Sequence, residues 1–240
     1  MPHPKKKRRP HVAPRFAQDR RPSDATAKRV AISEQEQAVR DLFSSSTCRC
    51  FVLKSFSEAN VHKSLKFGIW STTALHSALL DQVYRASSLT ADRPVLLFFS
   101  VCNTRHFHGI ARMTSSVQTD TQFQLWEKLK YEGFFRVEWL LVKDVPNYVL
   151  TGVKMSNTPT KKSITSCRDC EEVLCSEASE FLTRFTEFDS RSSAWDDFAH
   201  YDELQIQLEH KRGLVLSDEV DRTELSSYLV PLQEESLAST

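Results

Sequence analysis

The hydrophobic pattern of the chain changes near residue 47. Before that point Pro, Arg, Ser and Ala predominate with little apolar periodicity, so residues 1–46 are predicted to form a disordered basic tail. From there to about residue 188, apolar runs and alternating segments follow one another, as in a folded domain. Residues 189–240 turn acidic and keep only a weak helical pattern, which predicts a tail with a short helix that packs on a partner or back on the domain.

Strands are predicted where apolar residues run together or alternate with polar ones. Such segments are residues 51–53, 95–99, 106–114 and 134–142. In the last of these, Trp139 shares a face with Phe135 and Val137. This alternation predicts a core position for Trp139 rather than a contact with a ligand.

Helices are predicted from caps and from apolar spacing. Ser57 begins a helix that Gly68 ends, and Thr73 caps a second helix over residues 74–87. The buried stripe of the second helix is expected to comprise Leu75, Ala78, Leu79 and Val83. Ser176 is expected to cap a third helix, in which Ala178, Phe181, Leu182 and Phe185 follow helical spacing. The order strand, helix, helix, strands, helix predicts one α/β (α+β) domain over residues 47–188.

Charge is distributed unevenly, although the 240 residues carry a formal net charge of only +1. Residues 1–30 contain ten Lys or Arg and two Asp, whereas residues 186–240 contain four basic and thirteen acidic side chains. A near-neutral total therefore does not exclude nucleic-acid binding, which depends on the local field over one face. The basic run at residues 5–9, flanked by prolines, predicts a nuclear-import signal, an RNA-binding arm or both, and hence a nuclear protein.

Several classes of protein are disfavoured by what the sequence lacks. No apolar run is long enough to span a membrane. A zinc deaminase would need His-x-Glu, which the segment His106-Phe107-His108 lacks, and there is no phosphate-binding G-x-x-x-x-G-K-[ST] loop. Cysteines at 48, 50, 167 and 170 could be imagined as a zinc site, but the one-residue spacing of the first pair is unusual. We therefore expect no enzyme, no cofactor and no metal.

Four stretches in the folded region resemble the YTH domain family in order and spacing. They are residues 49–72, 97–113, 126–139 and 166–172. The segments Thr104-Arg105-His106-Phe107 and Arg168-Asp169-Cys170 look closest to the branch of the family attached to nuclear polyadenylation or splicing factors. From the residues alone, Trp70 and Trp126 lie outside regular apolar periodicity, which leaves structural and binding roles equally open.

The resemblance implies a curved mixed β-sheet wrapped by helices, with a pocket for one flipped-out N6-methyladenosine. By motif, the cage would be formed by Trp70, Trp126 and Tyr131. The adenine edge would meet the backbone N–H of Phe56, the side chain of Asn60 and the carbonyl of Ser71. The RNA phosphates would face Lys54 and Arg168, with Asp169 orienting Arg168.

Together these features predict a monomeric domain that reads N6-methyladenosine in single-stranded RNA and acts in nuclear mRNA processing, in splicing or polyadenylation. Its partners would be methylated RNA and splicing or polyadenylation factors, without a membrane. The alternative is a scaffold subunit of an RNA-processing complex that docks through the acidic C-terminal tail.

Overall fold

The computed structural model describes residues 25–45, 47–89, 93–214 and 221–232. Its helices are α2 (Ala25–Ser45), α3 (Glu58–Phe67), α4 (Ala74–Ser88), α5 (Asn147–Leu150), η1 (Ile164–Ser166), α6 (Cys175–Glu187), α7 (Phe198–Lys211) and η2 (Leu225–Tyr228). Its strands are β1 (Arg49–Ser55), β2 (Ile69–Trp70), β3 (Val95–Val101), β4 (His106–Met113), β5 (Thr121–Phe123), β6 (Phe135–Pro146), β7 (Glu171–Val173) and β8 (Leu229–Pro231). None of the described helices has the length and apolar character of a membrane span.

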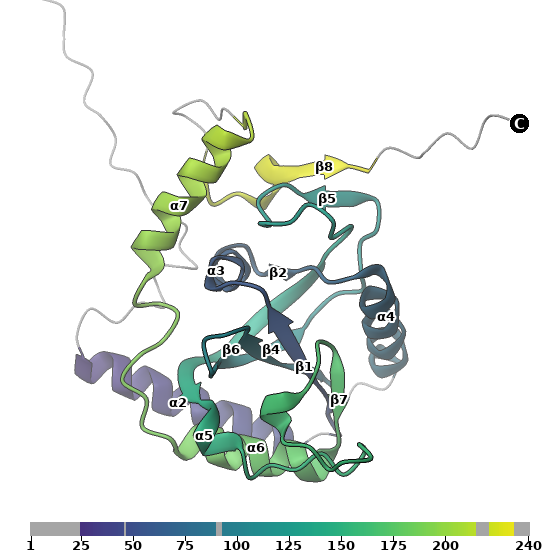
Figure 1. Ribbon diagram of the computed structural model, residues 1–240, viewed down its shortest axis with the longest axis vertical. Coiled ribbons are helices and arrows are strands. Elements are labelled where there is room, and N and C mark those ends of the chain that lie inside the picture. The colour runs from purple at the N-terminus through teal and green to yellow at the C-terminus, as the bar shows by residue number, and fades with distance from the viewer. Residues whose placement is uncertain (1–24, 46, 90–92, 215–220, 233–240) are drawn as a thin grey trace, which may run out of the picture.

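A six-stranded sheet in the order β2-β6-β4-β3-β1-β7 forms the centre of the domain. Only β1 and β3 run parallel, and the chain between them passes through α3, β2 and α4. Helices cover both sides of the sheet, with α2, α5 and α6 gathered on one side and α3 and α4 away from them (Figure 1). The predicted α+β class, a mixed sheet wrapped by helices, is confirmed.

Side chains that alternate along the strands build two cores, one on each face. On β1, Phe51 and Leu53 join a cluster with α3 and α4, whereas Val52 joins a cluster with α2 and α6. This is the period-2 alternation of a strand buried on both faces. The predicted core position of Trp139 is confirmed, since it is 5% exposed and its indole N–H donates to Ser64 Oγ over 3.1 Å.

The caps predicted at Ser57 and Thr73 are confirmed, whereas the cap predicted at Ser176 is wrong, because α6 begins at Cys175 and Leu174 precedes it without a side-chain cap. The stripe predicted for α4 is confirmed at Val83 and wrong at Leu75, Ala78 and Leu79. Ser57 Oγ and Thr73 Oγ1 accept from the backbone N–H three residues on, and Gly68 ends α3 in the left-handed region with φ 65°. On α4, however, Leu75 and Leu79 are 78% and 39% exposed. The residues of α4 that are buried are Ser77, Leu80, Val83 and Ser87. Helical spacing allowed both stripes, and the face that packs on the domain core is the one that carries Leu80 and Val83.

The predicted disordered tail is wrong for residues 25–45, which form α2; residues 1–24 lie outside the described residues. Val39 is buried, and three apolar neighbours on the same helix are partly buried against the α6 side: Ile32, Leu42 and Phe43. Glu36 pairs with buried Lys143 of β6 at 2.5 Å. Because polar residues separate these apolar positions, the apolar stripe is hard to recognise in the sequence. Such helices gain most of their stability from tertiary packing, which the local sequence does not show.

The C-terminal segment also folds onto the domain over the residues that the structure describes. Helix α7 contacts α3, and β8 pairs with β5 in a separate two-stranded sheet. Figure 1 shows α7 and β8 beside α3 and β5, at the end of the molecule farthest from α6. Of the two sequence alternatives for this segment, the structure shows packing back on the domain.

Candidate nucleic-acid interface

Three aromatic side chains from distant parts of the chain line one pocket. Trp70 ends β2, Trp126 follows β5, and Tyr131 precedes β6. The pocket contains about 300 Å³ of space between its walls, counted to its open mouth. Its lining comprises Lys54, Ser55, Phe56, Asn60, Trp70, Ser71, Thr72, Trp126, Tyr131 and Asp169.

Trp70 and Trp126 are adjacent walls and not the two sides of a sandwich. Their ring centroids lie 5.5 Å apart at an interplanar angle of 67°. Rings on either side of an inserted base would need to be about 7–8 Å apart, two van der Waals contacts of roughly 3.5–4 Å. A base that stacks on one indole therefore meets the other at an angle, and Tyr131 supplies the remaining side.

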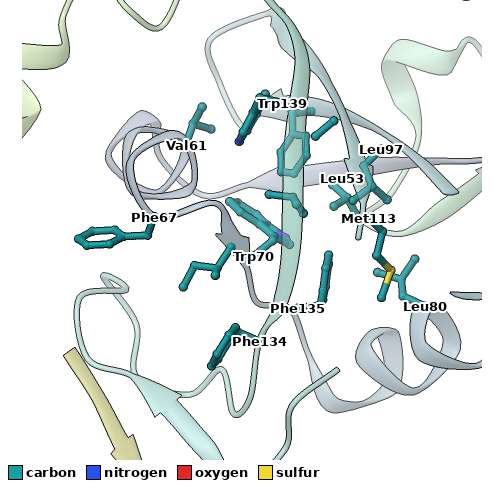
Figure 2. Close-up of a cluster of buried hydrophobic side chains, with 14 of the residues drawn as sticks. Leu53, Val61, Phe67, Trp70, Leu80, Leu97, Met113, Phe134, Phe135 and Trp139 are labelled. Carbon is teal, nitrogen blue, oxygen red and sulfur yellow. The ribbon is translucent and has the colours of Figure 1, made fainter. Parts of the chain in front are cut away.

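Trp70 is held from behind by the core. Its strand pairs with β6, where Trp70 is opposite Phe135, and its ring packs against that of Phe99 in a T-shaped arrangement with centroids 4.9 Å apart. Figure 2 shows Trp70 beside β6, between Trp139 and Phe135. The indole is only 5% exposed, so its orientation is set by close packing.

Trp126 is fixed by a hydrogen-bonded chain. Its indole N–H donates to Ser71 Oγ over 2.8 Å, and the Ser71 hydroxyl donates to the Gly133 carbonyl over 2.6 Å. Trp126 is 2% exposed and Ser71 6% exposed. The indole N–H is thus already used within the protein, and this wall offers a ligand its ring surface.

Asn60 presents an amide to the pocket from the first turn of α3. It is 5% exposed, and its Oδ1 accepts from the backbone N–H of Glu127 over 3.3 Å. That bond uses the acceptor end of the amide and leaves the NH₂ end as the donor available to a ligand. A ring nitrogen with a lone pair is the partner that such a donor requires.

Two backbone groups at the pocket have no backbone partner among the described residues. They are the N–H of Phe56, just beyond β1, and the carbonyl of Ser71, just beyond β2. Both strands end at the pocket, so the hydrogen bonds between strands also stop there. One backbone donor and one backbone acceptor therefore remain for a ligand. A planar heterocycle with adjacent donor and acceptor atoms matches such a pair.

Asp169 ties the pocket rim together, and its carboxylate is not bonded to Arg168. One oxygen accepts from the Lys54 backbone N–H over 2.8 Å. The other lies 3.1 Å from both Thr72 Oγ1 and His76 Nδ1. The expected orienting role toward Arg168 is therefore not what the geometry shows, because the two oxygens bond to groups of Lys54, Thr72 and His76 instead.

The pocket opens onto a wider groove that is rich in cations. The two share Lys54, Phe56, Tyr131 and Asp169 in their linings. The groove adds Arg105, Lys130 and Arg168 along its length. Lys54 is the most enclosed of its cations: Nζ lies 3.2 Å from Ser100 Oγ, and burial lowers the pKa of the amine.

Sequence reasoning missed the cations at the pocket mouth. The ring of Phe56 is 52% exposed, with Lys128 Nζ 3.8 Å and Lys130 Nζ 5.6 Å from its centroid. Lys130 Nζ also lies 5.3 Å from the Tyr131 ring. The sequence signal that could have indicated this site was the pair Lys128 and Lys130 beside Tyr131 in a polar segment. Lysines in such segments are usually solvated surface charges, so the signal is weak. The Phe56 ring, expected to matter only through its backbone, is also part of this surface.

The imagined zinc site is not assembled. Among the described residues, no group of three or more His, Cys, Asp or Glu side chains could hold a metal ion. Cys48, Cys50 and Cys167 lie in the core beside α6, whereas Cys170 lies in the opposite one.

A comparison with protein families decides the identity of this site. The model of the YTH (YT521-B-like) domain matches residues 48–186, more than half of the chain. The chain belongs to the YTH family. That span contains every pocket wall and every groove cation described above.

Curated relatives and solved structures agree with this assignment. YTH domain-containing family protein 3 of Homo sapiens is 38% identical over 164 residues, which cover 68% of this chain and 28% of that protein. Protein 2 of Mus musculus is 38% identical over 161 residues, covering 67% and 27%. The chain thus spans between a quarter and a third of the length of these relatives.

Two of the similar structures were solved with the modified base. The Pho92 YTH domain in complex with m6A is 33% identical with a TM-score of 0.55, covering 60% of this chain and 89% of that one. The Toxoplasma CPSF4 YTH domain, in complex with a 7-mer m6A-modified RNA, is 26% identical with a TM-score of 0.53, covering 61% and 96%. These comparisons establish the YTH family and leave its branch undecided.

Proposed function

We propose that this protein is a monomeric reader of N6-methyladenosine in single-stranded RNA. The observation that carries the proposal is the convergence of Trp70, Trp126 and Tyr131 on one pocket that opens onto a cationic groove. The m6A complexes of similar YTH domains support the same ligand. The proposed role is binding, without a catalytic step.

In the proposed complex the purine enters the pocket edge first. It stacks on the aromatic walls while its polar edge meets the N–H of Phe56, the NH₂ of Asn60 and the carbonyl of Ser71. The remaining N6–H of the modified base donates to that carbonyl, and a ring nitrogen accepts from Asn60. Because a base can enter such a pocket only when unstacked and turned out, the target is single-stranded.

Selectivity for the methyl group comes from what the cage denies to plain adenine. Burying one methyl stabilises the complex by about 0.8 kcal/mol, which favours the modified base only a few fold. Unmodified adenine would place an extra N–H against apolar rings without a partner, at a cost of about 1–3 kcal/mol. Stacking contributes roughly 1–3 kcal/mol to both bases and therefore adds affinity more than discrimination.

The groove beside the pocket is proposed to hold the RNA backbone. Lys54, Arg105, Lys130 and Arg168 line it and would face phosphates without reading sequence. Neutralising phosphates releases counterions, so affinity should fall steeply with salt.

Binding of labelled RNA that carries one N6-methyladenosine, compared with the same RNA unmodified, tests the proposal. The methylated RNA should bind at least several-fold more tightly at fixed salt, and equal affinities would refute a reader function. Trp126→Ala should abolish the preference. Arg168→Ala should weaken both RNAs alike and lower the salt slope by about one. Arg184→Ala, on α6 across the sheet, is the matched control and should change neither.

We also propose that the protein acts in nuclear mRNA processing, in splicing or polyadenylation. Support comes from the basic run at residues 5–9, which lies outside the described residues, and from the resemblance of residues 104–107 and 168–170 to the nuclear branch. Replacing the five cations with alanine in the full chain should reduce nuclear accumulation in cells. Unchanged localisation would contradict an import role for this run.

A scaffold that docks through residues 189–240 has less support. Over residues 198–211 and 229–231 that segment contacts α3 and β5 of its own domain. Its buried side chains, including Phe198, Glu209 and Tyr228, are therefore not available to a partner.

A further inference from the structure

The C-terminal segment reaches the pocket although it lies outside residues 48–186, the span that matches the family. It first meets α3, the helix that carries Asn60. Asp202 Oδ1 of α7 lies 3.0 Å from His62 Nε2 and 2.8 Å from Lys66 Nζ, and the ring of Phe198 lies 4.2 Å from that of His62. Charge pairing and aromatic packing therefore hold the two helices together.

At the end of α7, Arg212 binds the backbone that carries Trp126. Its Nη1 donates to the carbonyl of Gln124 and, over 2.7 Å, to that of Trp126. Its Nη2 donates to the carbonyl of Glu127 over 3.1 Å. A guanidinium presents its donors in a rigid planar fork, so binding these three carbonyls fixes the path of the turn.

The rest of the segment holds the same turn from its other end. Strand β8 pairs with β5, so that Phe123 is opposite Leu229, and the Gln124 N–H donates to the Tyr228 carbonyl over 2.9 Å. The Tyr228 ring packs edge-on to Phe123, at 6.2 Å, and Phe123 in turn packs against Trp126 at 5.0 Å. The wall residue is therefore backed by C-terminal contacts on its side chain and its backbone.

The same backbone also orients Asn60. The Glu127 N–H that Asn60 Oδ1 accepts belongs to the peptide unit between Trp126 and Glu127, and Arg212 binds the carbonyl of that unit. Movement of this one unit would displace the Trp126 wall and release the Asn60 amide. The Arg212 contacts, which act as a clamp on this peptide unit, therefore position both the apolar wall and the polar amide that would recognise the base.

We propose that residues 195–214 and 221–232 are an integral part of the recognition module and that Arg212 is a positioning residue for Trp126 and Asn60. The proposal rests on the reader function proposed above. It predicts that the matched family span, without this segment, has a poorly ordered pocket.

Arg212→Gln in the full chain tests the clamp, with Lys211→Gln as a matched control at an exposed position of the same helix end. The preference for methylated over plain RNA should fall about tenfold in Arg212→Gln, a loss of roughly 1.4 kcal/mol of discrimination. It should fall less in Arg212→Lys, which keeps the charge and one set of donors, and should not change in Lys211→Gln.

The indole N–H signals in a proton–nitrogen NMR spectrum give a second readout that does not need RNA. Substitution of each Trp by Phe assigns them. In Arg212→Gln the Trp126 signal should shift or broaden, whereas that of Trp139, which donates to Ser64 one turn farther along α3, should stay. Loss of general stability would not single out one indole.

The outcomes separate the two proposals. If the wild-type chain shows no preference for the methylated base, the reader function fails, while the Trp126 signal still decides the clamp. An unmoved Trp126 signal, or an unchanged preference in Arg212→Gln beside a selective wild type, overturns the clamp. If Arg212→Gln does not fold, Arg212→Lys is measured in its place. The clamp proposal is then overturned if Arg212→Lys keeps the wild-type preference for methylated RNA and its Trp126 signal does not move.

Discussion

Replacing Ser71 with alanine should loosen the Trp126 wall without removing any ring. The hydroxyl accepts from the Trp126 indole N–H and donates to the Gly133 carbonyl, and neither side chain is more than 6% exposed. Ser71→Ala therefore leaves one buried donor and one buried acceptor without this partner. The indole becomes free to rotate about its side-chain torsions to seek another.

The magnitude follows from the two lost bonds. A buried polar group left unpaired costs about 1–3 kcal/mol, so two such groups should lower the free energy of unfolding by about 2–6 kcal/mol. The affinity for RNA should also fall, because the Trp126 indole is no longer held in one orientation. We expect affinity for methylated RNA to fall about tenfold, with a smaller loss for unmodified RNA.

A double-mutant cycle in urea unfolding assigns the effect to this bond. Trp126→Phe keeps a ring but removes the N–H, so in its background Ser71→Ala should cost about 1–3 kcal/mol less than in the wild type. Ser64→Ala is the control, because Ser64 accepts from Trp139 and should not couple to position 126. A coupling below about 0.5 kcal/mol between Ser71 and Trp126 would refute the reasoning.

Two further predictions concern parts of the fold away from the pocket. Glu36→Ala leaves Lys143, whose side chain is 1% exposed, without its carboxylate, and should destabilise the protein by about 3–5 kcal/mol in chemical denaturation. RNA binding by the folded Glu36→Ala variant should not change. Glu34 is exposed on the same helix, and if Glu34→Ala lowered the free energy of unfolding as much as Glu36→Ala, the buried ion pair would not be the cause. Burial raises the pKa of the Glu177 carboxyl, but hydrogen bonds from four donors outweigh it and lower the pKa from 4.5 to about 2; the donors are the backbone N–H and hydroxyl of Ser156, the Ser176 hydroxyl and the backbone N–H of Glu177 itself. The ionised Glu177 carboxylate therefore contributes up to about 3 kcal/mol to stability above pH 4.5, and this contribution is lost as the pH falls toward 2. In Glu177→Gln the free energy of unfolding should depend less on pH between 4.5 and 2 than in the wild type. If the wild type and the variant showed the same pH dependence in this window, the explanation would be wrong.

Residues with short-range signals were predictable from the sequence. The caps at Ser57 and Thr73 are satisfied by backbone groups three residues away, so a local pattern carries all the information. Strand β3 is buried along its whole length, and its unbroken apolar run indicated that. Motif resemblance likewise selected Trp70, Trp126 and Tyr131, which the structure brings to one pocket.

Contacts between distant segments were not predictable in the same way. The stripe of α4 was misplaced because Leu75 and Ser77 both fit a helical repeat, and only the sheet beneath determines which face is covered. Asp169 was assigned to its neighbour Arg168, but its partners Lys54 and Thr72 are about a hundred residues away in the chain.

The sequence by itself therefore determined the period of the central strands, the starts of α3 and α4 and the set of aromatic residues that a methylated purine requires. Only the tertiary structure decided which groups remain free to bind and which are already used. The Trp126 indole N–H bonds to Ser71, and Arg212 holds the Trp126 backbone from 86 residues away. The physical reason is that hydrogen-bond satisfaction and packing depend on distance in space, whereas propensity and periodicity depend on distance along the chain.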